Sequence, residues 1–180
     1  EFKISKPHDN TQSFLEYLID SNYGKEILNQ SEPHIREMFR LKKKIENINE
    51  SLSQYGLSFH DQTRVLLAAK ADLAQYCNFT SKLSKKLVLL EAYENKGIIK
   101  DIQGKFLFYD ILTNTEVRED LDYEFLWSLY NLSVVYFNLG VNLKYKVFEE
   151  QTLADDMIKE AMKDFQIAVA GLSMVKSKIK

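Results

Sequence analysis

The sequence has few of the residues that interrupt regular structure or support redox chemistry. Its 180 residues include only 6 glycines, 2 prolines and 1 cysteine. Scarce glycine and proline favour long helices over many short strands. The single cysteine, Cys77, excludes an intramolecular disulfide and a CxxC metal or redox motif, which fits a reducing cytosolic compartment.

A strong net charge and long apolar runs are also missing. The 24 basic and 26 acidic side chains leave a formal net charge of -2. Most of the cations are lysines, and only four arginines supply the planar fork that suits bidentate phosphate recognition: Arg36, Arg40, Arg64 and Arg118. We therefore expect no nucleic-acid partner. No apolar run approaches the roughly 18 residues that span a bilayer. With the single cysteine and no signal peptide recognised, we expect a cytoplasmic protein.

Motifs of enzymes are absent from the sequence as well. There is no HExxH, no GxSxG and no glycine-rich phosphate loop. The histidines are scattered along the chain at His8, His34 and His60. The neighbouring acids Asp155-Asp156 and Glu149-Glu150 lie about 100° apart on a helix, so they do not converge. We expect no enzyme activity, cofactor, metal site or small-molecule substrate, and we interpret Cys77 as a small core residue.

What the sequence does contain is helical periodicity. It predicts five helices, over about residues 11–22, 31–55, 60–95, 122–149 and 153–180. Ser31 is expected to cap the second helix, with Pro33 in its first turn, and Tyr55-Gly56 to end it.

Each long helix carries a predicted core stripe. In the second helix the stripe is Ile35, Met38, Leu41, Ile45, Ile48 and Leu52, with Lys42, Lys43, Lys44 and Glu46 expected on the solvent side. The third repeats the pattern at Val65, Leu66, Ala69, Leu73, Tyr76 and Cys77, then at Leu83, Leu87, Leu90 and Tyr93. The fourth has Trp127, Tyr130, Val134, Phe137 and Val141, and the fifth has Ile158, Ala161, Phe165, Ala168, Leu172, Val175 and Ile179.

The last two helices are predicted to pack as a pair. The small residues Ala168, Ala170 and Gly171 would allow a neighbouring helix to approach closely. Helices four and five then form an αα-hairpin of the kind found in tetratricopeptide-like arrays. The chain shows no 34-residue repeat of that family along its whole length.

A dense aromatic run breaks the helical period near residues 98–112. Phe106-Leu107-Phe108-Tyr109 is too short and too β-prone for a helix, which indicates a small β-hairpin or an extended strap laid on the helices. The aromatic run has two possible roles, as a structural cover over the helices or as an edge that binds a peptide. Trp127 likewise has two, as a side chain packed in the core or as an anchor for a partner.

The run Phe106–Asp110 resembles the strand of the Bro-one domain, found in Alix-like adaptors of endosomal sorting. A variable loop follows in that family, matched here by Ile111–Asp120. The family's next helix starts with tyrosine-glutamate and has an asparagine-centred core, which Tyr123-Glu124 and Tyr130–Gly140 resemble. Its following helix resembles Phe165–Lys176. These pieces cover about 70 residues in the order that the family has them.

The resemblance implies a fold and a function. It implies that residues 1–180 form a single domain corresponding to the N-terminal half of a Bro-one-like helical domain. Such domains bind the C-terminal amphipathic helix of an ESCRT-III core subunit and reach endosomal membranes through their partners. Carried over to this chain, the partner-binding residues are Leu172, near a family anchor position, and Lys176, an adjacent charge partner.

Two other readings remain open from the sequence. One is a tetratricopeptide-like structural or signalling scaffold with a different protein partner. For this scaffold we expect a loop or a helix at Phe106–Tyr109. The other is a long helical surface that senses membrane shape, which the near-neutral charge disfavours.

Overall fold

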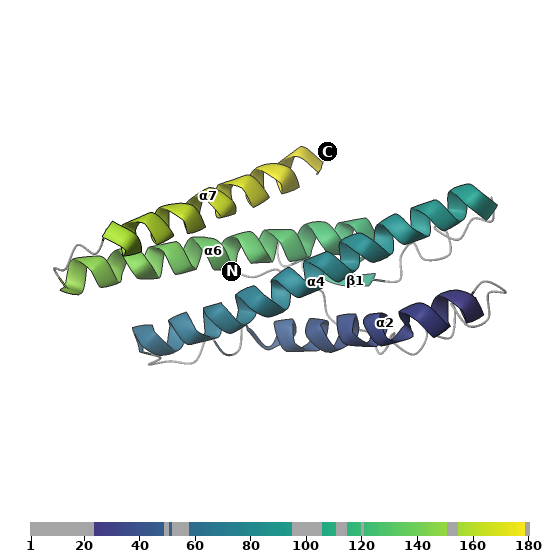
Figure 1. Ribbon diagram of the computed structural model, residues 1–180, viewed down its shortest axis with the longest axis horizontal. Coiled ribbons are helices and arrows are strands. Elements are labelled where there is room, and N and C mark those ends of the chain that lie inside the picture. The colour runs from purple at the N-terminus through teal and green to yellow at the C-terminus, as the bar shows by residue number, and fades with distance from the viewer. Residues whose placement is uncertain are drawn as a thin grey trace. The chain divides into compact units, whose positions relative to one another are not determined.

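The computed structural model describes residues 24–48, 51, 58–94, 106–110, 115–119, 121–150 and 155–178 of the 180-residue chain. Within these ranges the chain has four helices and one two-stranded sheet, and Figure 1 shows how the helices run. The expected mostly helical class is confirmed. The short helix expected over about residues 11–22 lies outside the described residues.

The first described helix, α2, spans Gly24–Glu46 and begins earlier than the sequence predicted. The predicted start at Ser31 is wrong, because Pro33 lies inside the helix rather than in its first turn. Residues 25–30 include Lys, Glu, Leu and Gln, which form helices readily, so the helix continues through the proline despite its local cost. The stop predicted at Tyr55-Gly56 lies outside the described residues.

The core stripe predicted for this region is confirmed at its described members, with one exception on its polar side, whereas Leu52 and the side chain of Glu46 lie outside the described part. Its buried members are Ile35, Met38, Leu41, Ile45 and Ile48. Lys43 and Lys44 are exposed as expected. Lys42 was also expected in solvent, and this is wrong, because only 5% of it is exposed.

The second described helix, α4, spans Phe59–Glu94 and agrees with the predicted element. Ser58 caps it: its hydroxyl accepts a hydrogen bond from the Asp61 backbone N–H at 3.1 Å and donates one to the Asp61 carboxylate at 2.6 Å. This reciprocal arrangement satisfies a backbone donor that has no partner within the helix. The buried face of α4 comprises Leu66, Ala69, Leu73, Tyr76, Cys77, Thr80 and Leu83.

The two strands are β1, Phe106–Asp110, and β2, Thr115–Glu119. They pair antiparallel, with Phe108 opposite Val117. Only β1 falls in the range near 98–112 where the sequence placed a hairpin, and residues 98–105 lie outside the described part of the chain. The resemblance matched Ile111–Asp120 to a variable loop, which is wrong for Thr115–Glu119, because these residues form β2.

The last two helices, α6 and α7, span Leu121–Glu150 and Asp155–Lys178, close to the predicted bounds. Figure 1 shows α7 running back alongside α6. The core stripe predicted for α6 is wrong in part, because Phe137 is 50% exposed and its other four members are only half-buried. Instead, α6 buries a more polar set: Glu124, Ser128, Asn131, Ser133, Val135, Leu139 and Asn142.

The described residues group into two compact units, whose boundaries fall inside α4 and α6. One unit holds residues 47–74 of the described chain, most of α6 and all of α7. The other holds α2, the remainder of α4, the two strands and the first turn of α6. Neither contains a helix that is both long and apolar enough to cross a membrane, among the residues described.

Candidate protein-interaction surface on α6 and α7

The contact between α6 and α7 is built from small side chains. The buried residues of α7 are Ala161, Asp164, Ala168 and Val175. Gly171 faces α6 so closely that a Cβ added to it would overlap Ser133 Oγ and lie 3.8 Å from a methyl group of Leu129. The sequence-based expectation of a close approach at Gly171 is therefore confirmed.

Larger apolar side chains lie beside this contact and remain partly in solvent. They recur at steps of four, three, four and three residues, which places them along one line of the helix. We call them the α7 row: Ile158, Met162, Phe165, Val169 and Leu172. At a rise of about 1.5 Å per residue the row is about 21 Å long.

In the α7 row, large apolar side chains are more exposed than the small and polar side chains beside them, which is the reverse of the usual pattern. Met162 is 57% exposed, Val169 63% and Leu172 37%, whereas Ala161 and Asp164 are 6% and 5% exposed. A helix placed only by hydrophobic burial would turn the larger side chains inward. Adjoining exposed apolar side chains on a surface are typical of a binding site for another molecule.

The apolar surface continues from α7 onto α6. The ring of Phe165 lies edge-on to that of Phe137, with 5.6 Å between their centroids. The Phe165 ring also lies against Gly140, where an added Cβ would be 3.0 Å from a ring carbon. Because Gly140 has no side chain, the Phe165 ring packs directly against the α6 backbone, with the half-exposed Phe137 beside it.

The structure places both of the partner-binding residues named from the resemblance at one end of this surface. Leu172 is the last member of the α7 row, and its exposure separates it from the core stripe to which the sequence also assigned it. Lys176 is exposed one turn later, at the next position of the same spacing. An apolar row ending in a cation suits a partner whose apolar face ends in a carboxylate.

Polar contacts also join α4 to α6 and α7. Lys70 Nζ lies 3.8 Å from the Asp164 carboxylate of α7 and 4.5 Å from the ring centroid of Tyr136 on α6. Asn142 of α6 donates a hydrogen bond of 3.1 Å to Thr63 Oγ1 of α4. One lysine therefore contacts both helices that form the apolar surface.

Burial raises the pKa of the Asp164 carboxyl above its ordinary value, and this effect exceeds the opposing one of Lys70. Glu160 raises the pKa further, whereas Lys163 lowers it. A folded-state pKa above the unfolded one means that the folded state binds the proton more tightly. The contribution of Asp164 to stability is then full below about pH 4 and is lost as pH rises through the folded pKa.

We expect Asp164→Asn to remove this pH dependence, because asparagine carries no titrating proton. The free energy of unfolding of the wild type should fall relative to that of the variant as pH rises from about 4 to 7. Urea titrations across this range measure the difference. Lys70→Met should move the loss to higher pH, because it removes the cation that opposes the burial effect. A constant difference between Asp164→Asn and wild type would contradict the assignment.

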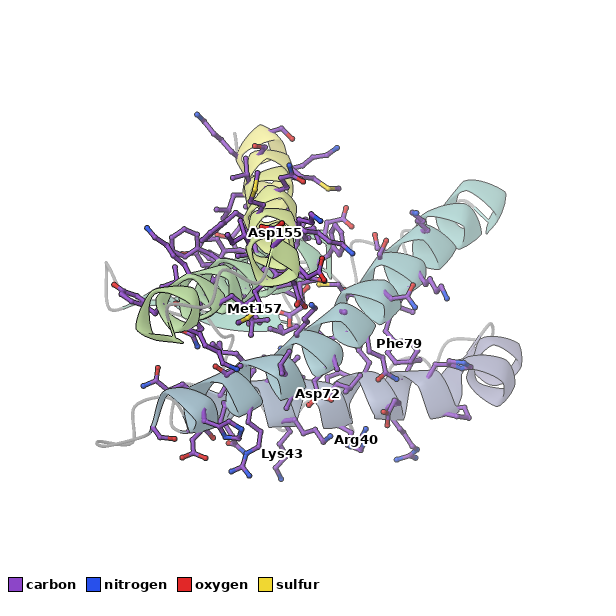
Figure 2. All side chains as sticks on the ribbon, turned by 60° about the vertical axis from the view of Figure 1, so that its left-hand side comes forward. Arg40, Lys43, Asp72, Phe79, Asp155 and Met157 are labelled. Atoms are coloured by element: carbon purple, nitrogen blue, oxygen red, sulfur yellow. The ribbon has the colours of Figure 1, made fainter. Side chains whose placement is uncertain are left out.

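The other reactive side chains do not converge on this surface. His34 and His60 are exposed, and Cys77 is a buried free thiol, as the core interpretation predicted. Asp155 and Asp156 are both exposed, and Figure 2 shows the first at the start of α7. No group of three metal-ligating side chains occurs among the residues that the structure describes.

Sequence reasoning missed Met162, Val169 and Phe137 as surface residues. For Met162 and Val169 the signal was present as a second apolar spacing on α7, offset by one residue from the buried positions Ala161 and Ala168. Periodicity alone does not say which of two adjoining apolar lines a neighbouring helix covers.

Comparison of the chain with protein-family models, with curated proteins and with solved structures finds no match to any of them. The resemblance to the Bro-one domain consequently rests on the residues and their order alone.

Proposed function

We propose that the chain is a non-catalytic scaffold of the Bro-one type, which binds the C-terminal amphipathic helix of an ESCRT-III subunit. The binding surface is the α7 row together with Phe137, with Lys176 at its end. In this proposal the chain corresponds to the N-terminal half of a Bro-one-like domain and reaches endosomal membranes through its partner.

The observation that carries the proposal is the exposed α7 row. An amphipathic helix docks through apolar side chains spaced three and four residues apart, and the row repeats that spacing over about 21 Å, or four turns. The row lies beside α6, so a partner helix would contact side chains from two elements. Burying Met162, Val169 and Leu172 would remove from water the apolar area that they now expose.

The finer features of the fold belong to the same proposal. We assign α6 and α7 to a tetratricopeptide-like hairpin, supported by their antiparallel run and by the small residues Gly171 and Ser133 at their contact. We assign β1 and β2 to the Bro-one hairpin, supported by their antiparallel pairing immediately before α6.

Titration of fluorescent peptides from ESCRT-III C-termini into the 180-residue chain tests the proposal. Leu172→Asp should weaken binding by about 30-fold or more, since the loss of an apolar anchor is worth about 2 kcal/mol. Ile167→Asp is a matched control, because Ile167 and Leu172 are each 37% exposed on the same helix. Five residues apart, they point about 140° away from each other.

The control should leave affinity within about threefold of wild type, because Ile167 lies off the α7 row. Equal losses from both variants would mean that aspartate disturbs α7 generally. Absence of binding by the wild type to every peptide would overturn the ESCRT-III assignment. Binding that is insensitive to Leu172→Asp would overturn the assignment of the surface.

A further inference from the structure

The exposed side of α2 carries a cluster of cations. Within nine residues it presents four exposed cationic side chains: Arg36, Arg40, Lys43 and Lys44. We call these the α2 basic row. Successive residues of a helix are about 100° apart, so the four lie within about 100° of its circumference and about 12 Å of its length.

Exposed cations outnumber the described carboxylates along the row. Glu37 is the one carboxylate among the described side chains between Arg36 and Lys44, and it accepts two hydrogen bonds from Arg40, at 2.6 and 2.5 Å. The Arg40 hydrogen bond lowers the pKa of Glu37. The exposed Lys159 and Lys163 of α7 differ, because exposed acids lie among them at Asp155, Asp156 and Glu160. The whole chain has a net charge of -2, so the basic row is a local feature.

The row faces outward from its unit. The opposite face of α2 is buried through Ile35, Met38 and Leu41. His34 of α2 packs edge-on against Phe79 of α4, with ring centroids 5.9 Å apart. In Figure 2, Arg40 and Lys43 project from the side of α2 away from Phe79.

We propose that the α2 basic row is a direct contact site for an anionic lipid surface. A headgroup layer needs only cations on long side chains that can reach one plane, which Arg36, Arg40 and Lys43 supply at steps of four and three residues. This inference is independent of the proposed function, in which the membrane is reached through a protein partner.

Two rival partners fit the row less well. Single-stranded nucleic acid binds through aromatic side chains on which bases stack, in addition to cations. A docked peptide is anchored by apolar side chains in pockets. Among residues 33–45, 47 and 48, the part of this region whose side chains are described, no large apolar side chain is exposed. The one exposed aromatic side chain there is His34, which lies off the row and packs against Phe79. The row therefore offers charge without stacking or anchoring groups, which favours a lipid surface.

Co-sedimentation of the full 180-residue chain with vesicles tests the inference. We expect the chain to sediment with phosphatidylcholine vesicles that contain about 30% phosphatidylserine, and not with phosphatidylcholine alone. Binding should fall steeply between about 0.1 M and about 1 M NaCl, because the Debye length shrinks from about 10 Å to about 3 Å.

The decisive variant combines Arg36→Glu, Arg40→Glu and Lys43→Glu. Each cation near an anionic surface contributes roughly a factor of five, so loss of the three cations should lower the partition coefficient by about 100-fold or more. The matched control combines Arg64→Glu, Lys82→Glu and Lys85→Glu, which changes the net charge equally at three exposed positions of α4. This control should keep at least about a third of wild-type binding, because its charges lie off the row.

The milder triple variant with glutamine at Arg36, Arg40 and Lys43 separates lost binding from lost folding. It should retain the wild-type circular dichroism and still lose most vesicle binding. Equal losses from the α2 and α4 charge reversals would overturn the inference, as would equal binding to neutral and anionic vesicles. Binding of polyglutamate or an oligonucleotide through the row, without vesicle binding, would overturn it in favour of those partners.

Discussion

Replacing Glu124 with alanine is expected to lower the free energy of unfolding by about 3–5 kcal/mol, the largest effect that we predict for a single substitution. Glu124 is 3% exposed and lies in the first turn of α6. Its carboxylate lies 3.2 Å from Lys42 Nζ of α2 and accepts a hydrogen bond from the Tyr76 hydroxyl of α4. The substitution therefore breaks a contact between three elements of one unit.

The size of the effect comes from the lysine left behind. Lys42 is 5% exposed and Tyr76 is 2% exposed, so water reaches neither group freely. Desolvating an ion costs several kcal/mol, and the attraction of an opposite charge offsets that cost only while the partner is present. Without the carboxylate, the buried ammonium group loses this counter-charge, and either water must reach it or α2 must move. Tyr76→Phe keeps the ion pair, so it should cost only about 1 kcal/mol.

The double variant Lys42→Met with Glu124→Leu separates the two contributions. Buried ion pairs replaced by apolar side chains of similar volume are often neutral or stabilising, so the double variant should recover most of the loss. Urea unfolding followed by circular dichroism gives both the midpoint and the slope for each variant. A double variant as unstable as the sum of its single changes would show that Lys42 and Glu124 act independently.

Lys42 also shows where reasoning from one sequence reaches its limit. The stripe at Ile35, Met38 and Leu41 was predictable because helical spacing is a local pattern. Lys42 follows Leu41 directly and, as a lysine, was assigned to solvent. Its partner Glu124 lies on another helix far along the chain, and no local pattern in the sequence indicates that pairing. The burial of a charged side chain can thus be predicted only after the position of its counter-charge is known.

The same limit explains why the α6 face was misassigned while its bounds were predicted well. The apolar line through Phe137 was visible, but α6 turns polar residues toward its neighbours instead. Asn142 is buried because it bonds to Thr63 of α4, and Ser133 is buried because Gly171 of α7 leaves room for it. Both partners are distant in sequence. Consequently the position of Leu172 on α7 was predictable, whereas its exposure required the structure.

Replacing Gly171 with valine is expected to lower the free energy of unfolding by about 3 kcal/mol. A Cβ at this position would overlap Ser133 Oγ and lie 3.3 Å from Ser133 Cβ, and valine adds two further methyl groups. Ser133 is 2% exposed, and its hydroxyl donates a hydrogen bond of 2.8 Å to the Leu129 carbonyl. Moving the hydroxyl aside would break that bond in a buried site, so we expect α7 to shift instead.

Ala170→Val is the control for this substitution, because it introduces the same side chain at the neighbouring, exposed position. Its cost should stay below about 1 kcal/mol, the range of helix propensity alone. The smaller change Gly171→Ala should be destabilising in the wild type and nearly neutral in a Ser133→Ala background, where the overlapping oxygen is gone. Thermal and urea unfolding of these variants form a double-mutant cycle, and additivity in it would contradict a direct contact between the two positions.

A displaced α7 would also carry the α7 row with it, since Leu172 directly follows Gly171. Under conditions where Gly171→Val remains folded, we therefore expect it to weaken the binding of a partner helix, although its own side chain faces α6. Ala170→Val should leave that binding within about threefold of wild type. A variant destabilised by about 3 kcal/mol yet binding normally would mean that the α7 row tolerates movement of the helix. The apolar residues would then act individually rather than as one rigid surface.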